Sequence, residues 1–116
     1  MAVKLNRTAY EHAEELIKAG HRVQDNRGDW SERQPSAAEE NRFIQDHSLP
    51  EYARWHLGVD DENGEGTKGR YEFPYGDLQD VYRSALLAAE SRAGQYDHRD
   101  IELAAAHLLG MLDEAS

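Results

Sequence analysis

One stretch, residues 70–112, constrains the fold of this chain more than any other. Between Arg70 and Tyr75, aromatic residues alternate with other residues, which is the period of a strand with one buried face. This strand is expected to pair with an extended Leu57–Val59 as a two-stranded hairpin, closed by the long loop from Asp60 to Gly69. The aromatic residues of its buried face are Tyr71, Phe73 and Tyr75.

Two helices are predicted to follow the strand and to pack as an αα-hairpin. Asp77 can cap the first helix, and Gly94 can end it because glycine readily adopts the left-handed conformation. Asp97 can cap the second helix, and the alanine-rich inner faces allow the two axes to approach closely. The inner face of the first helix comprises Leu78, Val81, Tyr82, Ala85, Ala88 and Ala89, and that of the second Ile101, Ala104, Ala105, Leu108 and Leu112.

Capping-box patterns predict two helices in the N-terminal part of the chain. In Thr8–Glu11 and in Ser36–Glu39, a hydroxyl residue is followed three positions later by glutamate. The first pattern predicts a helix from about Ala9 to Ala19, and the second a helix that ends at about His47.

Two further segments complete the N-terminal half. The charged segment His21–Pro35 lacks periodicity, and we expect a surface loop held in place by Trp30. Ser48-Leu49-Pro50 predicts the start of a short helix, because proline is tolerated in a first turn, and Tyr52 and Trp55 are then expected to face the core. The sequence therefore predicts a mainly α fold with a small β-hairpin (α+β). It predicts one domain, residues 1–116, with helices and a loop over 1–47 and the hairpin plus helix pair over 48–116.

Charge restricts the partners that this chain can bind. Its 116 residues include 13 Lys or Arg and 23 Asp or Glu, so the net charge is -10. Such a charge repels nucleic-acid phosphates and anionic lipid and favours cationic partners. There is no cysteine, no long apolar run and no glycine-rich phosphate motif. We therefore expect a cytoplasmic protein that binds no membrane, no nucleic acid and no cofactor.

The loop before the aromatic strand partly matches a calcium-binding loop. Oxygen-bearing side chains occur at ligand positions of that pattern, with glycine at the sharp turn. Lys68 replaces the usual aliphatic residue, and Phe73-Pro74 prevents the helix that should follow. Both a calcium site and a solvated acidic tip remain open. The residues in question are Asp61, Asn63, Glu65, Gly66 and Glu72.

A second polar group lies within the predicted helix pair. Glu90 is flanked by small residues, so it can be partly buried and would then need a partner such as Arg92 or Arg83. One interpretation is a general acid/base or a ligand clamp, and the other, which we favour, is a structural ion pair. The group comprises Arg83, Glu90, Arg92 and Tyr96.

Several short runs carry a resemblance to known proteins. They are Trp55-His56-Leu57-Gly58, residues 67–77, residues 89–96, Asp100-Ile101-Glu102 and residues 104–108. Together they resemble a family of small uncharacterised bacterial proteins, which implies no particular activity. Phe73-Pro74-Tyr75-Gly76 and the helix pair are also similar to a small module of phage head and prohead-protease-type polypeptides, which implies a phage or prophage origin.

Three functions remain open from the sequence. The preferred one is a non-enzymatic interaction or accessory protein that binds a protein partner. The second is a small metal-binding or enzymatic domain that uses the acidic loop or Glu90 and Arg92. The third is an acidic mimic of nucleic acid, which rests on net charge alone.

Overall fold

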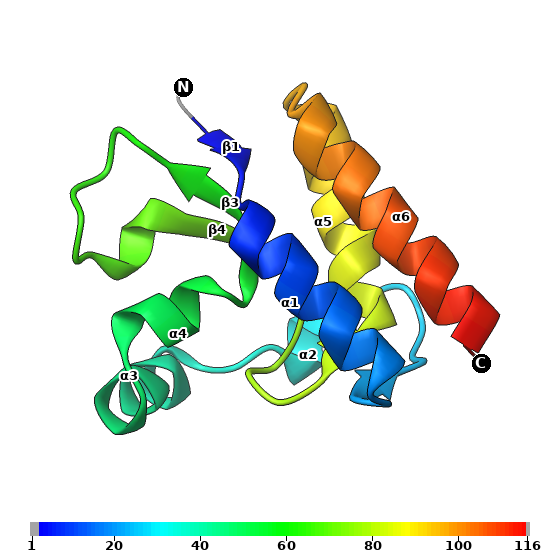
Figure 1. Cartoon of the computed structure of the whole chain (residues 1–116), viewed down its shortest axis with the longest axis horizontal. Helices are drawn as coiled ribbons and strands as arrows, with labels where there is room; N and C mark the ends of the chain where they lie inside the picture. The colour runs from blue at the N-terminus through cyan, green and yellow to red at the C-terminus, as the bar shows by residue number, and fades with distance from the viewer. Residues whose placement is uncertain (1–2, 116) are drawn as a thin grey trace.

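A computed structural model describes residues 3–115 of the chain. Its mainly helical α+β architecture, with a small antiparallel sheet, confirms the predicted fold class (Figure 1). The elements are, in chain order, β1 (Val3–Leu5), α1 (Arg7–Lys18), β2 (Arg22–Val23), α2 (Trp30–Arg33), α3 (Ala37–Asp46), α4 (Leu49–Ala53), β3 (His56–Asp60), a 3-10 turn (Lys68–Arg70), β4 (Tyr71–Pro74), β5 (Val81–Tyr82), α5 (Arg83–Gln95) and α6 (Arg99–Ala115).

The predicted hairpin is present and forms part of a three-stranded sheet. β3 and β4 are antiparallel, with Val59 opposite Tyr71. The sequence does not predict β1, which pairs with the other side of β3. The amide of Leu5 in β1 donates to the carboxylate of Asp100 at the start of α6, at 2.8 Å. This contact joins the sheet to the helix pair.

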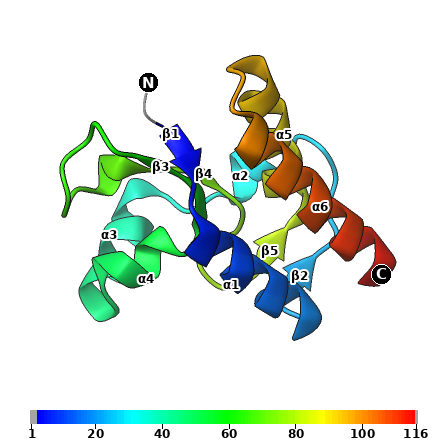
Figure 2. The same ribbon diagram turned by 45° about the horizontal axis from the view of Figure 1, so that its top comes forward.

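Helices α5 and α6 lie side by side, as predicted (Figures 1 and 2). The predicted inner face of α5 is right only in part, because Ala85 and Ala89 are buried whereas Ala88 is exposed. The apolar residues expected on the inner face of α6 are all buried. Gly94 does not end α5, which continues for one more residue, and the left-handed residue is Asp97, with φ 59°. Asp97 is not the predicted cap of the second helix, because α6 begins only at Arg99. Gly94 instead faces α6, because a Cβ there would lie 2.7 Å from a carboxylate oxygen of Glu102. Its lack of a side chain permits the close approach of the helices.

The start of α5 differs from the prediction. The sequence predicts a helix from Asp77, but residues 77–80 form a turn in which the Asp77 carboxylate accepts hydrogen bonds from the amides of Gln79 and Asp80, at 3.0 and 2.8 Å. Leu78 in this turn is left-handed, with φ 73°. The chain then runs through β5, which pairs in parallel with β2 (Figure 2). The helix therefore begins only at Arg83.

Asp25 supplies the cap that α5 lacks at its own start. Tyr82, which precedes the helix, makes no capping hydrogen bond. The buried carboxylate of Asp25 accepts hydrogen bonds from the amide and the hydroxyl of Ser84, at 2.7 and 2.6 Å. Asp25 thus fixes the segment of residues 21–35 to α5. The sequence predicts this segment as a loop, but it includes strand β2 and helix α2. The burial of Trp30 agrees with the predicted role of this residue as the loop's anchor.

The N-terminal helices follow the capping patterns in part. Asn6, not Thr8, caps α1, by accepting a hydrogen bond from the amide of Ala9 at 3.4 Å. The predicted capping box at Ser36 is confirmed, with reciprocal hydrogen bonds to Glu39 at 3.1 and 3.0 Å. Within the described residues, no helix combines the length and the apolar composition needed to cross a membrane.

Candidate functional site

A groove runs between β4 and α5, and it is the candidate site that includes three of the predicted polar residues, Glu72, Arg92 and Tyr96. It consists of two adjoining hollows of about 300 and 250 Å³, and both are lined by Glu72, Phe73 and Arg92. The first hollow is also lined by Trp30, Gln34, Pro74, Ala85, Ala88 and Ala89, and the second by Tyr96 and His98. We call these residues together the β4–α5 groove.

Phe73 shapes the sheet side of the groove. It has a φ of 63°, a conformation that bulky residues rarely adopt and that costs about 1–3 kcal/mol. Its ring lies over Gly58, where an added Cβ would come within 2.7 Å of the ring, and meets His98 edge-on, with ring centroids 5.8 Å apart. Pro74 follows and has no amide to donate. This part of the β4 edge is therefore a poor template for an added strand.

The opposite side of the groove is made of small side chains. Ala85, Ala88 and Ala89 from α5 line the first hollow, and Ala88 is exposed. Trp30 also lines this hollow, and its ring is tilted against that of Tyr82 at a centroid separation of 5.7 Å. The alanines leave space that larger residues would fill. The result is an apolar hollow large enough for one or two side chains of a ligand.

Two opposite charges border this apolar surface. Glu72 is half-buried and forms no side-chain hydrogen bond or ion pair within residues 3–115. Arg92 is exposed, and its guanidinium carbon lies 5.6 Å from the centroid of the Tyr96 ring. Such a cation–π contact leaves the N–H groups of the arginine free to donate. The groove can therefore accept a cation at Glu72 and an acceptor or a second planar group at Arg92.

The structure divides the polar group predicted on α5. Arg92 and Tyr96 line the groove, whereas Arg83 pairs with Asp113 of α6, with Nε and Oδ1 3.3 Å apart. Glu90 is half-buried and, within the described part of the chain, pairs with neither Arg83 nor Arg92. The expected structural ion pair is therefore not formed. Sequence periodicity cannot reveal this division, because it depends on what packs against each face of α5.

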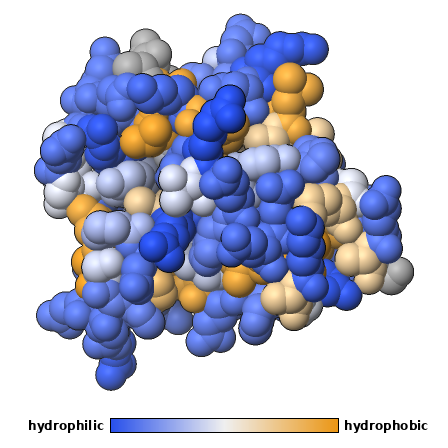
Figure 3. Space-filling model, viewed as in Figure 1, coloured by the Kyte–Doolittle hydropathy of each residue, from blue (hydrophilic) through white to orange (hydrophobic). Residues whose placement is uncertain are grey.

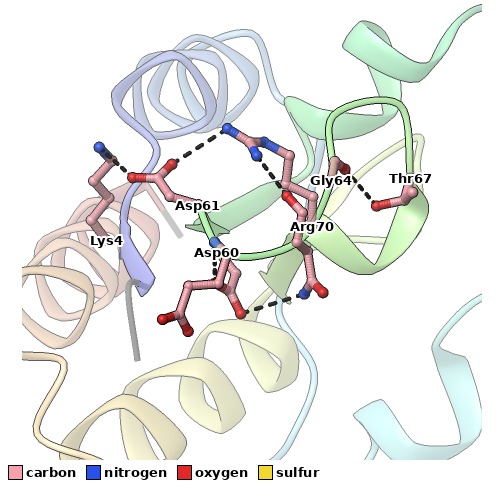
Figure 4. A network of polar contacts seen from close by, with 8 residues as sticks. Lys4, Asp60, Asp61, Gly64, Thr67 and Arg70 are labelled. Atoms are coloured by element: carbon pink, nitrogen blue, oxygen red, sulfur yellow. Dashed lines mark hydrogen bonds and ion pairs between the residues drawn. The ribbon is translucent and has the colours of Figure 1, made fainter.

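The residues of the predicted calcium loop are also separated. Asp61 forms an ion pair with Lys4 of β1 at 2.7 Å and a longer one with Arg70 at 3.4 Å (Figure 4). The hydrogen bond from Lys4 is the main reason that the pKa of Asp61 lies below its ordinary value. Asn63 donates its side-chain amide to the carbonyl of Gly69 at 3.0 Å.

Of the remaining predicted ligands, Glu65 is exposed in the loop and Glu72 lies in the groove. Among residues 3–115, no three histidine or carboxylate side chains gather in a way that could hold a metal ion. The calcium site and the solvated acidic tip thus stay two alternatives, which a calcium titration distinguishes.

Sequence reasoning did not place Trp30, Gln34 or the α5 alanines beside Glu72. The signals were present, since Trp30 is an isolated apolar residue in a polar loop and the alanines repeat along one helix. What was missing is the contact of α2 with α5, which brings residues far apart in sequence to one surface. Comparisons with protein-family models, curated proteins and solved structures found no match. Function is therefore inferred from the groove itself.

Proposed function

We propose that this protein is a non-enzymatic interaction protein of the cytoplasm, which binds a short segment of a partner protein in the β4–α5 groove. The observation that carries the proposal is the unpaired carboxylate of Glu72 beside an apolar hollow. Hot spots of protein recognition combine a buried apolar anchor with a specific polar contact. The first hollow, at about 300 Å³, is at the lower limit for a small-molecule pocket, but it suits one large side chain.

The chemistry of the groove favours a basic and apolar segment. A lysine or arginine of the partner would pair with Glu72, and an adjacent apolar residue would fill the space beside Ala88. The net charge of -10 would attract such a segment at long range. The face of the molecule drawn in Figure 3 is largely hydrophilic with small separate apolar patches, so selective binding would depend on local pockets.

Selection from a random-peptide display library on the immobilised protein tests this proposal. We expect enrichment of peptides with Lys or Arg next to Trp, Phe or Leu. Ala88→Trp should abolish their binding by filling the hollow. Ala106→Trp is the matched control, because Ala106 is an exposed helical alanine on α6 outside the groove. Enriched peptides that bind both variants as tightly as the unmodified protein would overturn the assignment of the groove.

The role of Glu72 is tested separately. Glu72→Gln should lower the affinity for a selected basic peptide by about tenfold. This is the typical effect of losing one partly exposed charge pair with its hydrogen bond. Glu11→Gln removes the same charge from an exposed position on α1 and should change the affinity much less. Equal losses in the two variants would show that only the overall negative field attracts the peptide.

A further inference from the structure

A larger hollow, of about 680 Å³, lies on the other side of β4. Neighbouring residues of a strand face opposite ways, so Tyr71 lines this hollow while Glu72 lines the β4–α5 groove. Side chains of α4, β3 and β4 form its apolar wall. They are Leu49, Pro50, Ala53, Val59 and Tyr71.

The wall offers an aromatic surface. Tyr71 lies directly opposite Val59 across the hairpin, so the two side chains are neighbours on one face of the sheet. The Tyr71 ring is flanked by the rings of Tyr52 and His56, with centroids 6.4 and 6.5 Å away. Both of these neighbours are buried, whereas the Tyr71 ring is half-buried and partly open to the hollow. A flat ligand could lie against this surface.

Two arginines line the same hollow. Arg70 is held in place by its donation to the carbonyl of Asn63 at 2.7 Å and by the carboxylate of Asp61 at 3.4 Å. A guanidinium has five N–H groups, so these two contacts leave donors available. Arg54 is exposed, and its side chain forms no hydrogen bond or ion pair within residues 3–115. The carboxylate that lines the hollow is that of Glu65, which is exposed.

We propose that this hollow binds a small aromatic anion. The aromatic body would pack against Val59 and Tyr71, and the carboxylate or phosphate group would accept hydrogen bonds from Arg54 and Arg70. The bidentate geometry of arginine suits either anion. This inference is independent of the proposed peptide groove.

The ligand is expected to be small because the protein is strongly acidic. Two arginines and one glutamate line the hollow, within a chain of net charge -10. Asp61 lies beside Arg70, so Arg54 is the lining arginine that has no carboxylate partner among the described residues. A nucleic acid would place many phosphates in the negative field around this hollow, whereas a single anion meets mainly the two arginines. One charged group on an apolar body therefore matches the site better than a polyanion does.

The probe is naphthyl phosphate, titrated into the full chain while amide NMR shifts are recorded. Naphthol and inorganic phosphate are titrated in parallel, because each carries only one half of the proposed chemistry. We expect saturable shifts at Val59, Gly66 and Tyr71 with naphthyl phosphate, and binding at least about tenfold weaker for the two partial probes. Naphthol that binds as tightly as its phosphate would overturn the proposal, as would shifts confined to the β4–α5 groove.

Variants identify the cationic contacts. Arg54→Gln should lower the affinity for naphthyl phosphate by about tenfold. Arg99→Gln, an exposed arginine on α6, should leave the affinity unchanged and controls for net charge. Arg70→Lys keeps the charge but removes the planar fork, so binding should weaken while the fold is retained. Unchanged affinity in both Arg54→Gln and Arg70→Lys would also overturn the proposal.

Discussion

Acidification should destabilise the protein through one buried histidine, His56. Its side chain is almost fully buried, and its Nδ1 lies 3.0 Å from the carbonyl oxygen of Tyr52. Because that oxygen can only accept, the neutral ring carries its proton on Nδ1. The ring also packs on that of Tyr52, with centroids 4.4 Å apart. Burial lowers the pKa of His56 from 6.5 to about 4, although the hydrogen bond to Tyr52 and the charge of Glu40 oppose this shift.

The sign of the effect follows from where the proton binds. The unfolded chain takes up a proton at His56 near pH 6.5, whereas the folded chain does so only near pH 4. The stabilising contribution of the neutral buried ring is therefore complete above about pH 6.5 and is lost as the pH falls towards 4. At about 1.4 kcal/mol per pKa unit, the loss is on the order of 3 kcal/mol, a large part of the stability of an ordinary domain.

Urea denaturation at a series of pH values from neutral to mildly acidic measures this loss. His56→Asn is the matched variant, because its amide can still donate to the carbonyl of Tyr52 but does not titrate. Titration of the other groups, including His12, whose pKa is also lowered by burial, is common to both proteins. The unfolding free energy should fall by about 3 kcal/mol more in the unmodified protein than in His56→Asn. Parallel pH profiles would refute the reasoning.

Four further results are expected, the first three from urea denaturation. Leu108→Ala should lower the free energy of unfolding by about 2–4 kcal/mol, because Leu108 is wholly buried, and an unchanged midpoint would contradict its place in the core. Gly58→Ala should lower the free energy of unfolding by about 1–3 kcal/mol, since its Cβ would meet the ring of Phe73. An unchanged free energy of unfolding would mean that this ring moves aside easily. Asp25→Ala should lower the free energy of unfolding by about 2–3 kcal/mol, and Asp25→Asn should lower it less, because asparagine keeps one acceptor for the start of α5. Equal losses in the two variants would argue against the capping role of Asp25. Calcium should cause only small, linear amide shifts in residues 60–65, whereas saturation at micromolar metal would establish a calcium site.

The sequence predicts best those elements whose signals are local and repeated. The α6 stripe has the predicted phase, and Ser36 caps its helix as predicted, because both depend on residues within a few positions of each other. The helix prediction for the stretch after Asp77 is wrong for the same reason, because it too uses only local signals. Leu78, Val81 and Tyr82 fit a helical period, but β2 offers Val81 and Tyr82 a strand partner from far away in the chain. Local periodicity carries no information about such a long-range contact.

Strand β4 explains why the candidate sites could be predicted only in part. The alternation from Tyr71 to Tyr75 identifies a strand and implies that Tyr71 and Glu72 face opposite ways. It wrongly assigns Phe73 to the face of Tyr71, since Phe73 has a left-handed φ and lines the groove beside Glu72. It does not say what each face meets. In the structure α5 brings Arg92 to the side of Glu72, and Arg54, the residue after α4, lies on the side of Tyr71. One short strand thus separates two hollows of different chemistry, one open to a cation and the other lined by two arginines. If both proposals hold, Glu72→Gln should impair peptide binding without changing the affinity for naphthyl phosphate, and Arg54→Gln should do the reverse.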